Sequence, residues 1–170
     1  LYRRPHCTAM HELLDGSMPP AADPAFQTVI TRLGSVLPAR GRVTIFAPLG
    51  IGGHQDHRLV HAAVRTLALQ RPDWSVWYYE DVPYAFGTQP VKDRLQALEG
   101  YPRPATVDIS ATIADRIRLS RCYTSQVQAI FGSADDMQAA LEGYAAQVGT
   151  PRRPRERFWR VRDVGAHRAR

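Results

Sequence analysis

A glycine-rich loop that carries two histidines and an aspartate constrains this chain more than any other segment. Residues 48–57 read Pro-Leu-Gly-Ile-Gly-Gly-His-Gln-Asp-His and follow an apolar, β-branched segment at 43–47, which predicts a buried strand. An amphipathic helix is predicted over 58–70, and Asp56 can cap its start. Glycines let the backbone turn sharply and approach a ligand closely. Open α/β sheets place their chemistry in loops of this kind, after the carboxyl end of a strand.

Further strands and helices are predicted to alternate along the chain. Asp23-Pro24 starts a helix that runs to about Leu37, and Ser133-x-x-Asp136 resembles a capping box for a last helix that ends before Gly149. The other predicted elements are strands at 74–79, 106–109 and 158–161, the last on a sheet edge, and helices at 91–98 and 110–131. This alternation predicts an α/β fold with a mostly parallel sheet covered by helices on both faces.

Length and composition favour a single globular domain. With 170 residues the chain can bury a core, and we expect one domain over residues 1–162 and a basic tail at 163–170. No run of about 18 apolar residues occurs, which predicts no transmembrane helix, and the first residues show no apolar signal core. Two cysteines are too few for a disulfide scaffold, so we expect reduced thiols, a cytoplasmic protein and a buried Cys122 within a helix.

Positive charge is concentrated at the end of the chain. The net charge is +6, and residues 151–170 contain eight arginines against two acids. A basic end can contact nucleic acid or phosphate. Phe158 and Trp159 are the aromatic residues among these arginines. Surfaces that bind single-stranded nucleic acid interleave more aromatic side chains with the basic ones. A solvated, partly disordered terminus is therefore the favoured interpretation, and nucleic acid is not an expected partner.

The loop and three later segments resemble one enzyme family. Gly53-His54-Gln55-Asp56-His57-Arg58-Leu59-Val60 is similar to the second signature of the PIG-L (LmbE-like) deacetylases. The segments at 78–84, 123–132 and 156–159 are similar, in order, to that family's strand and loop bordering the substrate cleft, its late helix and its C-terminal strand. The resemblance covers residues 40–162. It implies a Rossmann-like fold, a zinc cofactor and removal of an acetyl group from an N-acetylglucosamine-type substrate.

The family's first signature, Pro-His-x-Asp-Asp-Glu, does not occur in this chain. The resemblance assigns two zinc ligands, a His and an Asp, and the general base to that signature. The early histidines His6 and His11 are not followed by an Asp-Asp pair. We therefore expect the first signature to precede Leu1, and we expect residues 1–170 alone to be inactive and poorly folded. The alternative is a naturally truncated, inactive relative.

The resemblance gives the loop residues separate roles. His57 is implied to be the third zinc ligand, since catalytic zinc takes three protein ligands and keeps a position for water. His54 is implied to stabilise the oxyanion of the tetrahedral intermediate as a cation. Asp56 is implied to pair with His54 and to keep it protonated and oriented. Candidate substrate contacts are Arg58, Glu80, Asp81 and Tyr84.

Each of these residues also has a simpler interpretation. A histidine at a helix start is often only a polar surface residue, and Asp56 can be an N-cap, a partner of His54, or both. His61 lies one turn beyond His57 and either completes a zinc-binding pair or lies on a helix face. Glu80 and Asp81 either contact sugar hydroxyls or are merely solvated.

Three classes of function follow from these patterns. The leading hypothesis is a zinc-dependent N-deacetylase that acts on an N-acetylated, amino-sugar-like small molecule. The second is a non-catalytic, metal-less relative that serves as a binding module, and the third is a nucleic-acid-binding protein. The sequence names no particular substrate and leaves homo-oligomerisation open.

Overall fold

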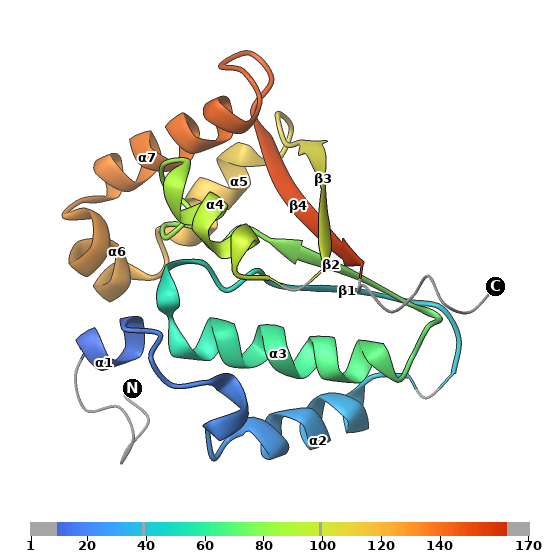
Figure 1. Cartoon of the computed structure of the whole chain (residues 1–170). Helices are drawn as coiled ribbons and strands as arrows, with labels where there is room; N and C mark the ends of the chain where they lie inside the picture. The colour runs from blue at the N-terminus through green and yellow to red at the C-terminus, as the bar shows by residue number, and fades with distance from the viewer. Residues whose placement is uncertain (1–9, 39, 99, 163–170) are drawn as a thin grey trace. The chain divides into compact units, whose positions relative to one another are not determined.

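The computed structural model describes residues 10–38, 40–98 and 100–162 (Figure 1). These residues form two compact units. The first contains the chain up to Pro104 together with the residues from Phe158 onward, and the second contains Ala105–Arg157. The predicted tail at 163–170 lies outside the described residues, and the single domain over 1–162 stays a prediction.

A strand–helix–strand segment forms the centre of the first unit. Strand β1 (Val43–Pro48) and strand β2 (Trp74–Tyr79) pair in parallel, with Val43 opposite Trp74 and Pro48 opposite Tyr79. Parallel neighbours need a crossover connection, which helix α3 (Gln55–Leu69) provides. Both strands lie where the alternation of β-branched and aromatic residues predicts them, within one residue.

The sheet is mixed rather than mostly parallel. Its strand order is β1-β2-β4-β3, where β3 is Tyr101–Asp108 and β4 is Arg155–Arg162. Strand β4 runs antiparallel to β2, with Tyr78 opposite Trp159. The α/β class is thus confirmed, but the described strands are not mostly parallel and β4 is not an edge strand. Hydrophobic periodicity marks a strand without fixing its direction, which depends on how the chain returns to the sheet.

Helix α2 (Phe26–Val36) covers α3 on the side away from β1 and β2 (Figure 1). It begins at Phe26, with Ala25 as its N-cap, rather than at the predicted Asp23-Pro24. Asp23 still orders the turn before the helix, because its Oδ1 accepts a hydrogen bond from the backbone N–H of Ala25 at 2.8 Å. The buried cluster between the helices contains Phe26, Leu59, Ala63 and the partly buried Val29, Ile30 and Leu33. This packing fixes α3, and with it the residues at its first turn. The unit also contains helices α1 (Met10–Leu14), η1 (Pro20–Ala22) and α4 (Gln89–Gln96).

The second unit contains helices α5 (Ile113–Ser120), α6 (Thr124–Phe131) and α7 (Ala134–Val148). The capping box is confirmed, since Ser133 Oγ accepts a hydrogen bond from the Asp136 N–H at 3.0 Å. The prediction of one helix over 110–131 is wrong, because the chain leaves the helical conformation at Tyr123. The buried Ile117 and Val127 are spaced by about three helical turns, so the apolar pattern does not reveal the break.

Two further predictions differ from the structure. Cys122 is exposed rather than buried, because it lies in the break between α5 and α6. The strand predicted at 158–161 in the basic end is longer than expected, since β4 runs over Arg155–Arg162. No helix among the described residues combines the length and the apolar character needed to cross a membrane.

Candidate functional site

The glycine-rich loop follows β1 and leads directly into α3 through the short helix η2 (Ile51–Gly53). Gly50, Gly52 and Gly53 all have positive φ angles, of 81°, 75° and 78°. A Cβ on Gly52 would lie 2.5 Å from Cβ of Tyr84, and a Cβ on Gly53 would collide with the backbone oxygen of Leu14. The close approach of Tyr84 therefore requires glycine at position 52.

Replacing Gly52 with alanine is expected to lower the free energy of unfolding by about 2 kcal/mol or more. The left-handed conformation alone costs an alanine about 1–2 kcal/mol, and the contact with Tyr84 adds to that cost. Gly143→Ala is the matched control, because a Cβ there meets nothing within 4 Å and the position lies inside α7. That control should be neutral or stabilising by up to about 1 kcal/mol. Equal effects of the two substitutions in urea titrations would contradict the tight loop.

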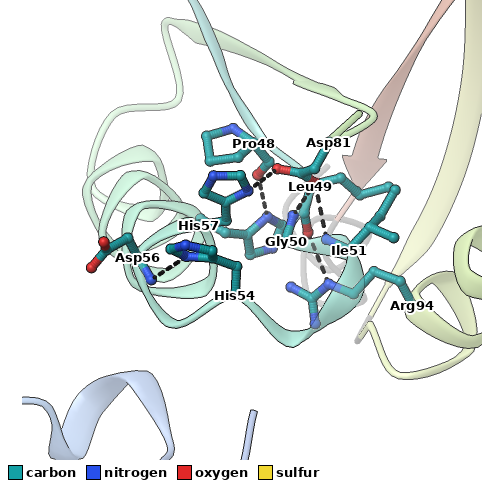
Figure 2. Close-up of polar contacts among 10 residues, drawn as sticks. Pro48, Leu49, Gly50, Ile51, His54, Asp56, His57, Asp81 and Arg94 are labelled. Atoms are coloured by element: carbon teal, nitrogen blue, oxygen red, sulfur yellow. Dashed lines mark hydrogen bonds and ion pairs between the residues drawn. The ribbon is translucent and has the colours of Figure 1, made fainter. Parts of the chain in front are cut away.

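Helix α3 begins one turn earlier than predicted, and its cap is His54 rather than Asp56. The Nδ1 atom of His54 accepts a hydrogen bond from the backbone N–H of Asp56 at 3.2 Å (Figure 2). Because Nδ1 is an acceptor in this arrangement, the ring is neutral with its proton on Nε2, whereas the cation that the resemblance implies would donate from both ring nitrogens. A pairing of the Asp56 carboxylate with His54 stays a prediction.

Three aromatic rings from the loop, α3 and the segment after β2 meet at the start of α3. The rings of His54 and His57 stack with their centroids 4.7 Å apart. The ring of Tyr84 lies 5.9 Å from that of His54 and 5.7 Å from that of His57. The structure thus brings together three of the predicted site residues, although Tyr84 is 27 residues beyond His57 in the sequence.

The imidazole of His57 contacts the carboxylate of Asp81 through its Nδ1 atom. The His57 Nδ1 atom lies 2.8 Å from Asp81 Oδ1, and the Asp81 side chain is fully buried whereas the His57 side chain is 34% exposed. Both atoms are buried, and neither completes a well-aligned hydrogen bond with a described group. The other carboxylate oxygen, Oδ2, accepts hydrogen bonds from the backbone N–H groups of Gly50 and Ile51, at 2.7 and 2.9 Å. Figure 2 shows Asp81 between the imidazole and the loop.

The remaining predicted substrate contacts have structural partners. Glu80 is buried, and its Oε1 accepts a hydrogen bond from Trp159 Nε1 at 2.8 Å. Arg58 donates from Nη1 to the backbone oxygen of Gly16 and lines a cavity of about 390 Å³ beside the glycines of the loop. Whether Arg58, Glu80 and Asp81 also contact a substrate stays a prediction.

Arg94 is a residue of this region that sequence reasoning missed. Its Nε donates to the backbone oxygen of Leu49 at 2.8 Å, and its side chain lines the same cavity as Arg58. Burial, and next the positive charge of Arg58, hold the pKa of Arg94 below its usual value. No local pattern marks Arg94, because its contact with the loop joins segments 45 residues apart.

His61 lies in the interior rather than on a free helix face. Its Nδ1 lies 3.1 Å from the backbone oxygen of Pro48, so that nitrogen carries the proton, and its ring packs 4.3 Å from that of Tyr78. Burial, and next the charge of Arg94, lower the pKa of His61 to about 4. The folded state therefore resists protonation of this ring more than the unfolded state does.

The buried His61 predicts a loss of stability in acid. Its contribution is fully present above the unfolded-state pKa of about 6.5 and is lost as the pH falls toward 4. The shift corresponds to about 3 kcal/mol. We expect the unfolding free energies of the wild type and of His61→Gln to converge by an amount of this order between pH 6.5 and pH 4. Parallel stability curves of the two proteins would contradict a buried neutral His61.

The described residues do not by themselves make up a complete zinc site. They contain no group of three or more His, Cys, Asp or Glu side chains placed to hold a metal. His57 nevertheless has the surroundings expected of one metal ligand. Its buried Nδ1 faces the Asp81 carboxylate. The exposed area of the side chain therefore lies on the rest of the ring, which carries Nε2. Histidines that bind metals commonly turn their other ring nitrogen toward a carboxylate or carbonyl in this way.

The chain shares its fold with solved structures of deacetylases. The chain superposes on the zinc-inhibited form of teicoplanin deacetylase with a TM-score of 0.68 and 20% identity, over 88% of this chain and 56% of that one. It superposes on the A40926 pseudoaglycone deacetylase with a TM-score of 0.60 and 18% identity, over 89% of this chain and 60% of that one. These similarities show that the chain has the fold of those two enzymes over most of its length.

One curated relative is more similar in sequence. The chain is 34% identical over 140 residues to the 2'-N-acetylparomamine deacetylase of Streptomyces fradiae. The match covers 81% of this chain and 47% of the relative, so the chain spans about half the length of that enzyme. No family model matches the chain.

Proposed function

We propose that this chain is part of a zinc-dependent N-deacetylase of the PIG-L (LmbE-like) type, which acts on an N-acetylated amino-sugar-like small molecule. The observation that carries the proposal is the convergence of His54, His57 and Tyr84 at the loop after β1, with Asp81 buried behind His57. The similarity to the 2'-N-acetylparomamine deacetylase and the fold shared with two further deacetylases support it.

His57 would hold the metal through Nε2. Zinc, when bound, polarises a carbonyl and activates water for attack on an amide. The two remaining ligands and the general base are those that the resemblance assigns to the first signature. In this proposal the described residues provide one ligand and the groups around it.

His54 would act on the oxyanion. Because its Nδ1 accepts a hydrogen bond from the Asp56 backbone, Nε2 is the nitrogen that can donate. A fixed donor aimed at the developing negative charge stabilises the transition state of acyl transfer. Hydrolysis breaks the amide C–N bond, transfers the water oxygen to the acetyl carbon and leaves acetate and a free amine. Tyr84, which contacts both imidazole rings, would close one side of the site.

The proposal extends to the fold around the site. The parallel unit β1–α3–β2 would be the described part of a larger Rossmann-like sheet, because a strand, a crossover helix and a parallel strand are the repeating unit of such sheets. We also propose that residues 1–162 form one domain, since β3 and β4 each have residues in both compact units.

The substrate class is tested by incubating the intact protein with 2'-N-acetylparomamine and measuring the mass of the small molecule by mass spectrometry. The proposal expects a product lighter by one acetyl group, and N-acetylglucosamine serves as a smaller probe of the same class. Failure of the zinc-loaded protein to deacetylate either compound would contradict the amino-sugar assignment.

A further inference from the structure

Asp81 joins three separate elements at the site. It follows β2 in the chain, its Oδ2 accepts hydrogen bonds from two N–H groups of the loop after β1, and its Oδ1 lies 2.8 Å from a histidine in the first turn of α3. The side chain is fully buried. Burying a carboxylate lowers the stability of the fold unless its oxygens have partners. The contacts with the loop and with the histidine are the partners of this carboxylate.

The carboxylate also fixes which ring nitrogen of His57 carries a proton. An ionised carboxylate accepts hydrogen bonds and cannot donate one. His57 Nδ1 faces Asp81 and must therefore be the protonated nitrogen of the neutral ring. This leaves a lone pair on Nε2, on the part of the ring that is exposed.

We propose that Asp81 is a positioning residue, which holds His57 with its proton on Nδ1 and so presents an unprotonated Nε2 to the zinc ion. The inference rests on the proposed function for its metal, although the tautomer itself does not depend on any metal. Because the same carboxylate binds the loop at Gly50 and Ile51, it also ties the orientation of the ring to the loop conformation. In this role Asp81 acts through His57.

The substitution Asp81→Asn reverses the hydrogen-bond polarity while it preserves size. The asparagine oxygen can still accept from the loop N–H groups, which turns its NH₂ group toward His57 Nδ1. An NH₂ group only donates, so Nδ1 becomes an acceptor and the ring proton moves to Nε2. A protonated Nε2 cannot bind zinc. We therefore expect an affinity loss of about 10–100-fold, the scale for removing such a supporting group.

The tautomer is measured by nitrogen–proton correlation NMR of the histidine rings in the metal-free intact protein at about pH 8, where ordinary imidazoles are neutral. Wild-type His57 should have its proton on Nδ1, and Asp81→Asn should move it to Nε2. Zinc affinity is measured on the same samples by competition with a chelator. A merely structural role for Asp81 would not move the tautomer.

Asp23→Asn is the matched control. Asp23 is also buried and also accepts hydrogen bonds, from the Ala25 N–H and from Gln55 Nε2. The control should keep both the His57 tautomer and the zinc affinity. A wild-type His57 protonated on Nε2 would overturn the inference, even if Asp81→Asn failed to fold. Unchanged tautomer and affinity in a folded Asp81→Asn protein would also overturn it, whereas a wild type with the expected tautomer but no zinc affinity would contradict only the proposed function.

Discussion

Replacing His57 with alanine is expected to lower the zinc affinity of the intact protein by about 3 kcal/mol, or more than about 100-fold. Four-ligand structural zinc sites bind with about 10–16 kcal/mol, so one ligand contributes about a quarter of that free energy. The structure supports the choice of His57, since its Nδ1 is directed at a buried carboxylate and its side chain is still 34% exposed. Metal content after dialysis against a graded chelator measures the change.

His61→Gln is the control for this experiment. His61 lies on the same helix, one turn later, but it is buried against Pro48 and Tyr78. We expect its replacement to change stability and to leave zinc affinity as in the wild type. Full zinc occupancy in His57→Ala, or an equal loss in His61→Gln, would refute the assignment of the ligand.

Replacing His54 with alanine is expected to reduce turnover by about 100-fold or more while zinc stays bound, which is the effect of removing one oxyanion donor. His54 also caps α3 through Asp56, and the loss of a cap costs about 1 kcal/mol of stability. His54→Ser separates the two roles, because serine is a good N-cap without an imidazole. The serine variant should regain stability and remain as slow as the alanine variant. Wild-type kcat in either variant would rule out the catalytic role.

Much of the site could be predicted from local sequence. The strand at 43–48, the turn that only glycines permit and the helix after it follow from residues close together in the chain, and they bring His54 and His57 to one point. Tyr84 came from the family resemblance, and the structure places its ring against both imidazoles.

The supporting contacts could not be predicted in the same way. Asp81 reaches the loop across 30 and 31 residues of sequence, and Arg94 reaches it across 45. The sequence shows that Glu80 and Asp81 are paired acids after a strand. It does not show that one is buried against Trp159 and the other against His57.

The direction of β4 and the start of α3 could not be predicted either, because they also depend on contacts between distant parts of the chain. Alternating apolar residues mark β4 as a strand, but its antiparallel place between β2 and β3 depends on the path of the chain through α5, α6 and α7. Asp56 is a favoured capping residue type, yet the backbone turn at Gly52 and Gly53 brings the imidazole of His54 to the cap instead.

Zinc-dependent deacetylation by the intact protein is tested most directly by measuring acetate release after the metal is removed and then returned. The protein is assayed with an N-acetylated amino sugar as purified, after chelation, and after addition of one equivalent of zinc. We predict acetate and free amine in equal amounts, loss of both after chelation and recovery with zinc. Acetate release that is unaffected by removal of the metal, or no release from the zinc-loaded protein, would contradict the account, and the second result would favour a metal-less binding module.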